Sequence, residues 1–134
     1  MKQKTSTTEA ETASTNDVAV ISDGEENSAF ASLSASLPEI RKLKGVMGYI
    51  LRSNTSAIVD LTESDKISQY AILTSKIHES CQKIAKQFNL GQTESVLVEG
   101  ENFKVLCLSI GENKISVLMD KSANHAWIIK RILL

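Results

Sequence analysis

Apolar positions along residues 46–119 follow two different periods, one typical of strands and one typical of a helix. Runs of β-branched and other apolar residues predict five strands. These strands cover residues 46–52, 56–61, 94–99, 103–110 and 114–119. Short segments rich in Gly, Asn and Ser separate neighbouring strands, as in hairpin connections. We therefore expect a two-stranded hairpin and, further along the chain, a three-stranded antiparallel meander.

Between these two units, residues 64–89 have helical spacing, with N-cap residue types before them and Gly91 as a stop signal after them. The apolar arc of this helix spans about 160°, wider than the roughly 100° stripe of a surface helix. Its members are Ile67, Tyr70, Ala71, Leu73, Thr74, Ile77, His78, Cys81, Ile84, Ala85 and Phe88. An arc of this width indicates that the helix covers a sheet with its centre and meets something else along one flank.

Two shorter helices complete the predicted domain. Leu37, Ile40 and Leu43 have helical spacing, with Pro38 in the first turn and Gly45 as the end signal. A last helix is predicted over residues 126–134. Residues 105–108 are apolar without alternation, which is typical of a central strand covered on both faces. The expected architecture is α+β: a five-stranded antiparallel sheet with helices on both faces, in the order α-ββ-α-βββ-α.

The composition divides the chain into a tail and a folded unit. Residues 1–36 contain 12 Ser and Thr residues and six acids against two lysines, a net charge of −4. Such a composition is typical of disorder. We therefore predict a disordered acidic tail at 1–35 and one domain at 36–134, with order beginning between Leu33 and Pro38. Within the tail, residues 18–21 form a β-prone patch beside acids, which could add as a strand to a partner's sheet edge.

Charge and cysteine usage narrow the classes of function. Residues 37–134 carry 13 Lys and Arg against 10 Asp and Glu, scattered along the segment, so binding to nucleic acid is disfavoured. The first residues lack an apolar segment and no run approaches 18 apolar residues, so we expect neither a signal peptide nor membrane insertion. Cys81 and Cys107 lie in apolar patterns. The absence of a predicted signal peptide and the apolar surroundings of the two cysteines favour a reduced, cytoplasmic setting.

No catalytic site, cofactor or metal site is predicted. The six glycines form no phosphate-binding motif. His78 and Cys81 share a helix face and could be half of a metal site or a thiol with its base, but only His125 and Cys107 remain as further His or Cys ligands, and no spacing groups them. We interpret His78 as a partly exposed residue at the edge of the core. The acids around residues 60–65 are explained by the helix dipole.

Two further features each have two interpretations. Trp127 in the last helix is either a core anchor, which is favoured, or an exposed contact for a partner. The cations Arg41, Lys42 and Lys44 form either a solvated helix face, which is favoured, or a docking site for an acidic protein surface.

The strand at 94–99 lacks Pro, Gly and internal Lys, the residues that discourage pairing between chains. A homodimer through this strand would explain both the unguarded edge and the wide helix arc. The predicted interface combines the helix flank with the strand. Its residues are Leu73, Ile77, Cys81, Ile84, Ser95, Val96, Leu97 and Val98.

Three segments carry a resemblance to a known family: residues 43–51 (LKGVMGYIL), 88–91 (FNLG) and 95–105 (SVLVEGENFKV). With the element order, they resemble the roadblock family of dynein-light-chain-type domains over residues 36–134. The resemblance implies a profilin-like or longin-like fold and dimers joined through the strand at 94–99 with their long helices side by side. It also implies a binding platform for small Ras-like GTPases, or a subunit of a motor or endomembrane scaffold. The turn Ser53-Asn54-Thr55 departs from the acidic-Gly turn frequent in the family.

We therefore predict a non-enzymatic homodimer that binds and regulates a small Ras-like GTPase. The candidate contact is Ile72, an apolar residue on the polar helix face, with Gln69, Lys76 and Lys83 around it. Alternatively, Ile72 is an isolated exposed apolar residue of the kind common on protein surfaces. The alternative functions are a purely structural scaffold subunit and a small thiol enzyme using Cys81 with His78.

Overall fold

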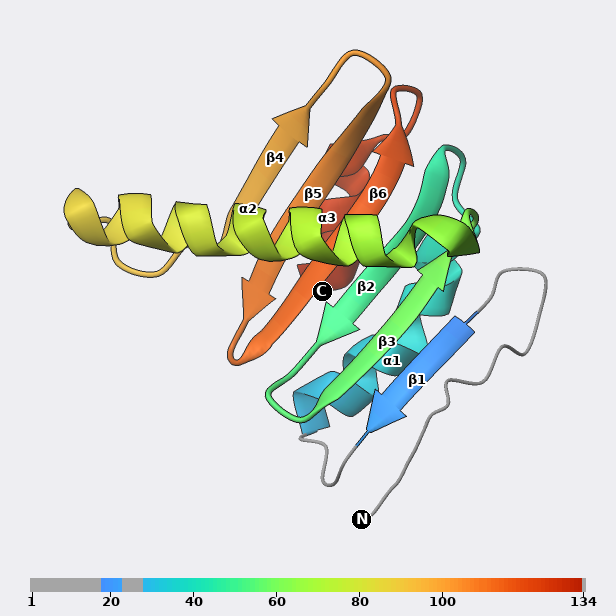
Figure 1. Ribbon diagram of the computed structural model, residues 1–134, viewed down its shortest axis with the longest axis horizontal. Coiled ribbons are helices and arrows are strands. Elements are labelled where there is room, and N and C mark those ends of the chain that lie inside the picture. Colours follow the sequence, from blue (N-terminus) through green and yellow to red (C-terminus); the bar gives the residue numbers. More distant parts are fainter. Residues whose placement is uncertain (1–17, 23–27, 134) are drawn as a thin grey trace.

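Six strands form one antiparallel sheet in the computed structural model, which describes residues 18–22 and 28–133 (Figure 1). The strand order is β1-β3-β2-β6-β5-β4. The strands are β1 (Val18–Ser22), β2 (Val46–Arg52), β3 (Ser56–Leu61), β4 (Ser95–Glu99), β5 (Phe103–Ile110) and β6 (Asn113–Asp120). The hairpin β2–β3 joins the meander β4–β5–β6 through the β2–β6 pairing. In this sheet β1 and β4 are the outermost strands.

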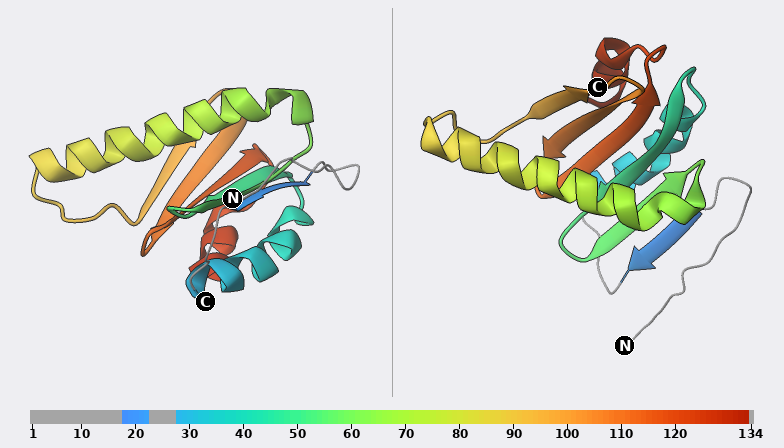
Figure 2. Two further views of the ribbon diagram at one scale, coloured as in Figure 1. Left: turned by 60° about the horizontal axis from the view of Figure 1, so that its bottom comes forward. Right: turned by 45° about the horizontal axis from the view of Figure 1, so that its top comes forward.

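The helices lie on both faces of the sheet (Figure 2). Helix α2 (Ile67–Gln87) follows a short 3-10 turn and crosses one face, whereas α1 (Ser28–Arg41) and α3 (His125–Leu133) cover the other. This arrangement confirms the predicted α+β class, and the burial of residues 104–108 confirms that β5 is an inner strand covered on both faces. No helix among the described residues is both long and apolar enough to cross a membrane.

The larger part of the core lies beneath α1 and α3. Apolar side chains recur along α1 at intervals of three or four residues, so one face of the helix packs on the sheet. Those fully buried on this face are Phe30, Leu33, Leu37 and Ile40. They join Ile128 and Ile132 of α3 and the sheet residues Leu51, Leu106 and Ile115 in one cluster.

The core beneath α2 is smaller and lies under its amino-terminal half. Ile50, Val59, Leu61 and Leu118 from the sheet form its buried centre. Tyr70 of α2 packs edge-on against Phe103 of β5 at its margin, with ring centroids 6.0 Å apart. The carboxyl-terminal half of α2 therefore contributes less apolar packing to its own domain.

Gly48 permits a bulge in β2. The register with β6 shifts between Val46 and Gly48, and a Cβ at Gly48 would collide with the Asp60 carbonyl oxygen on the neighbouring strand. Nearby, Arg41 is not the solvated cation that was predicted. Its Nε lies 3.4 Å from Asp60 Oδ1 and its Nη1 donates to the Val46 carbonyl at 3.0 Å, because the end of α1 rests on this part of the sheet.

The amino-terminal part differs from the predicted boundary. Helix α1 begins at Ser28, well before the expected start of order at 33–38, and Phe30 is already buried. Within the segment predicted to be disordered, residues 18–22 form β1, which pairs with all but the last residue of β3. The edge of β3 provides hydrogen-bond partners for residues 18–22, and the composition of the segment alone does not reveal these partners. The remainder of the predicted tail lies outside the described residues.

Candidate interaction surface

Strand β4 has one paired and one open edge in the described sheet. Its inner side pairs with β5 over the whole strand, from Ser95↔Leu108 to Glu99↔Lys104, and β4 ends the strand order. No residue of β4 is buried, and Val98 is among the exposed large apolar residues. The strand thus presents free backbone donors and acceptors without a Pro, Gly or Lys to discourage pairing.

Helix α2 extends past this edge. In Figure 1 the carboxyl-terminal turns of α2 project beyond β4. Three large apolar side chains are exposed there: Ile84 at 52%, Phe88 at 70% and Leu90 at 68% of their full surface. The helix closes with Leu90 N–H donating to the Ala85 carbonyl at 2.8 Å, which fixes the apolar residues that follow the last turn. We call Ile84, Phe88 and Leu90 the apolar overhang.

The predicted dimer residues fall into two groups. Thr74, His78 and Ala85 form the buried line of α2, and the flank beside it is left half-buried or exposed. The flank contains Leu73, Ile77 and Cys81, which are half-buried, and Ile84, which is exposed. On β4, Val96 and Leu97 are half-buried, whereas Ser95 and Val98 are exposed. The helix therefore covers the sheet with its centre and leaves a flank open, as its wide arc predicted.

Phe88 and Leu90 were not among the predicted interface residues. Phe88 belongs to the apolar arc, so periodicity alone assigns it to the core. Its exposure arises because the carboxyl-terminal turns of α2 project beyond β4 (Figure 1). The available signal was the pair of apolar residues flanking Asn89, immediately before the stop signal at Gly91.

A polar strip separates the middle of α2 from the sheet. Arg52 Nη2 donates to Thr74 Oγ1 at 3.2 Å, and His78 Nε2 lies 3.3 Å from Ser116 Oγ. His78 is buried, which corrects the expectation of a partly exposed residue, because α2 lies directly over β6 here. Burial, with Lys114 and Arg52 nearby, lowers the pKa of His78 to about 4.

The thiol hypothesis receives no geometric support. The His78 ring bonds to Ser116, and no hydrogen bond joins it to Cys81 within the described residues. Cys107 is buried beside Ser116, and burial raises the pKa of its thiol to about 11, so it stays protonated at neutral pH. In the described part of the chain, no group of three or more His, Cys, Asp or Glu side chains is placed to hold a metal ion.

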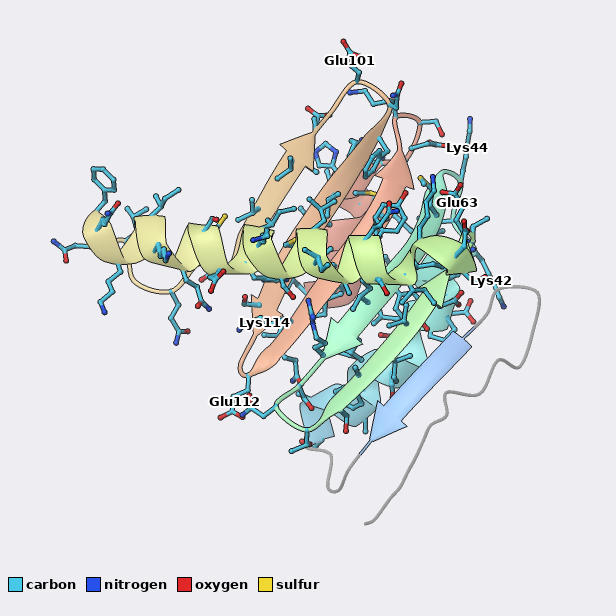
Figure 3. The ribbon with its side chains drawn as sticks, viewed as in Figure 1. Lys42, Lys44, Glu63, Glu101, Glu112 and Lys114 are labelled. Atoms are coloured by element: carbon cyan, nitrogen blue, oxygen red, sulfur yellow. The ribbon has the colours of Figure 1, made fainter. Side chains whose placement is uncertain are left out.

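An open cavity of about 600 Å³ lies between the second half of α2 and the end of the sheet where the β2–β3 and β5–β6 turns lie. Gln82 and Lys86 line it from the helix, and Glu112 and Lys114 from the β5–β6 turn region, where Figure 3 places them below α2. Glu112 accepts a hydrogen bond from Asn54 Nδ2 at 2.6 Å. The cavity is thus a polar recess on the side of α2 that carries Gln82 and Lys86, across the buried line from the open flank.

The face of α2 that points away from the sheet carries the candidate contact residues. Ile72 is 58% exposed, and Gln69, Lys76 and Lys83 are exposed around it. The four side chains share one side of the helix because their spacing follows the helical period.

Trp127 on α3 has the exposed position rather than the favoured core position. It is 41% exposed, and the Arg131 guanidinium lies 5.0 Å from its ring centre. Ile128 and Ile132 face the core, which directs Trp127 to the side of the helix. Lys42 and Lys44, which follow the end of α1, are solvated as predicted.

Comparison with solved structures identifies the fold. The crystal structure of a Roadblock/LC7 domain from Streptomyces avermitilis is similar with a TM-score of 0.61 and 15% sequence identity, over 82% of this chain and 90% of that one. No protein-family model and no curated protein sequence matches the chain. The chain therefore has a roadblock-type fold, as its sequence resemblance predicted.

Proposed function

We propose that the protein is a non-enzymatic, homodimeric binding module whose two copies join through β4 and α2. The observation that carries this proposal is the apolar overhang beside an unpaired strand edge. An open β4 needs a strand, and exposed Phe88 and Leu90 need an apolar surface. A second copy of the same chain supplies both.

A two-fold axis beside β4 would pair the open strand edge and cover the exposed apolar side chains at the same time. Antiparallel pairing of the two β4 strands continues the sheet from one copy into the other. The turns of α2 that extend past β4 then cover the partner's sheet, and the partner's α2 covers this copy in return. The half-buried flank of Leu73, Ile77 and Cys81 becomes the contact between the two helices.

We further propose that the dimer binds a small Ras-like GTPase and regulates it without nucleotide-binding residues of its own. Two observations support this proposal: the roadblock-type fold, which is known as a small binding module, and the sequence resemblance to a family that includes GTPase platforms. A binder of this kind regulates by favouring one state of the partner's mobile switch loops.

Exposed Ile72 is the proposed centre of the GTPase contact. An apolar residue within a rim of Gln69, Lys76 and Lys83 is the arrangement found at many protein interfaces. In the proposed dimer this outer face of α2 stays accessible, because the sheet and the helix flank make the other contacts.

Binding measurements with purified small GTPases test this proposal. Each GTPase from the source genome is loaded with GDP or a GTP analogue and titrated with wild-type protein and with Ile72→Glu. We expect one nucleotide state to bind and Ile72→Glu to weaken binding at least tenfold. Ala31→Glu, on the exposed face of α1, is the matched control. A protein that binds no GTPase in either state but is isolated in a stable complex lacking one is instead a scaffold subunit.

A further inference from the structure

The edge of the sheet opposite β4 is completed by the amino-terminal strand. Residues Val18–Ser22 pair with β3 in an antiparallel ladder that runs from Val18↔Asp60 to Ser22↔Ser56. The other edge of β3 pairs with β2. Strand β3 is therefore an inner strand only because β1 occupies its outer edge.

With β1 in place, β3 is buried as an inner strand is. Ser56, Val59, Asp60 and Leu61 are buried, whereas the true edge strand β4 has no buried residue. The strand contains no Pro, Lys or Gly that would discourage pairing if β1 left. An uncovered β3 would consequently be an acceptor for any suitable extended segment.

Strand β1 is held in a way that allows exchange. It lies at the end of the sheet and pairs with β3 alone, and five residues separate it from α1 at Ser28. The entropy lost in ordering a short terminal strand is comparable with the net gain from its hydrogen bonds. Docking of such a strand is therefore reversible.

We propose that the outer edge of β3 is a strand-acceptor site, filled in cis by Val18–Ser22, and that an extended segment of a protein partner displaces this strand to bind there. The cis strand indicates the chemistry that fits: four consecutive apolar residues with an acid on each side, Asp17 and Asp23.

Charge at one end of the site agrees with this specificity. Val18 lies opposite Asp60, whose carboxylate is already bound by Arg41 at the end of α1. Exposed Lys42 follows directly, and Figure 3 shows it at the end of the sheet where β1 begins. Lys42 Nζ lies 3.6 Å from Glu39 Oε2 in an ion pair whose side chains are both exposed, and an acid immediately before the paired segment would compete with Glu39 for this cation. This site is separate from β4 and does not depend on the proposed dimer.

A peptide in trans tests the site with the full chain. The double variant Val20→Pro/Ile21→Pro opens β3, because successive amides of a strand point in opposite directions and one of the two prolines must remove a donor to β3. A fluorescent, terminally blocked peptide of residues 16–24 is titrated against the variant and the wild type. We expect the variant to bind it at least tenfold more tightly, because the tethered strand competes in the wild type.

Three controls make the result decisive. A peptide with the same two prolines should not bind, the Asp17→Asn peptide should bind more weakly, and bound peptide should slow amide hydrogen exchange in residues 56–61. If the double variant loses its cooperative thermal transition, the milder Val18→Ser/Val20→Ser variant replaces it. A folded variant that fails to bind the peptide overturns the acceptor site. Equal affinity for variant and wild type overturns its closure in cis.

Discussion

His78 on α2 and Ser116 on β6 face each other across the polar strip, with Nε2 of the imidazole 3.3 Å from the serine Oγ. The ring is buried, and Lys114 and Arg52 are the nearby positive charges. Burial, followed by the repulsion from these cations, lowers the pKa of His78 from 6.5 to about 4. At neutral pH the folded protein therefore holds a neutral imidazole between helix and sheet.

We expect the free energy of unfolding to decrease as the pH is lowered from about 6.5 to 4. In this range the unfolded chain binds a proton on His78 and the folded chain does not, so acid favours unfolding. The contribution is at most about 3 kcal/mol, because one pKa unit corresponds to about 1.4 kcal/mol. Urea unfolding at a series of pH values measures it.

His78→Gln is the control for this prediction. It removes the titrating group while retaining a side chain that can bond to Ser116, so stability should depend less on pH above pH 4. The comparison ends there because the pKa of Asp120 is lowered by hydrogen bonds from Ser122, and protonating Asp120 at lower pH adds a second loss of stability. An unchanged slope in His78→Gln would contradict the assignment.

Arg41→Met should destabilise the fold by about 1–3 kcal/mol. The substitution keeps most of the apolar stem but removes the Arg41 guanidinium from the buried Asp60 carboxylate and the Arg41 donor from the Val46 carbonyl. The measurement is urea unfolding at pH 7. In a double-mutant cycle with Asp60→Asn, the two losses should be less than additive. A change within experimental error for Arg41→Met would show that this ion pair contributes nothing.

The strand and long-helix positions follow from the sequence because their signals are local. Strands β2, β3 and β5 have the predicted bounds, and Gly111, with φ of 61°, occupies the left-handed position required by the β5–β6 turn. The open edge and the helix flank also follow, since they depend on missing guard residues and on the width of an apolar arc.

Other features depend on tertiary context. The docking of β1 requires the β3 edge, and the burial of His78 requires the sheet beneath α2. The exposure of Phe88 depends on how far α2 extends past β4, and that of Trp127 on which residues of α3 face the core. Neither the periodicity nor the composition of the sequence shows how these elements are placed relative to one another.

Phe30→Ala tests whether the first turn of α1 belongs to the folded unit. The sequence predicted that order begins only between Leu33 and Pro38, after this turn. The ring is fully buried in the larger core, so we expect a loss of about 3–5 kcal/mol in the free energy of unfolding. Ala31→Ser, on the exposed side of the same turn, should change stability by less than about 0.5 kcal/mol. Equal effects of the two substitutions would place the start of the folded domain beyond this turn.

Phe88→Asp tests the proposed dimer without disturbing the core, because the ring is 70% exposed in the single chain. A charge in the apolar overhang would be buried without a partner at the interface, so the dimer should dissociate. Light scattering after size exclusion should then give the monomer mass of 14.6 kDa for the variant and about twice that mass for the wild type. Ile72→Asp is the matched control, with similar exposure but on the outer face of α2, and it should remain dimeric. A wild-type protein that stays monomeric at micromolar concentration would contradict the dimer, as would dissociation of both variants alike.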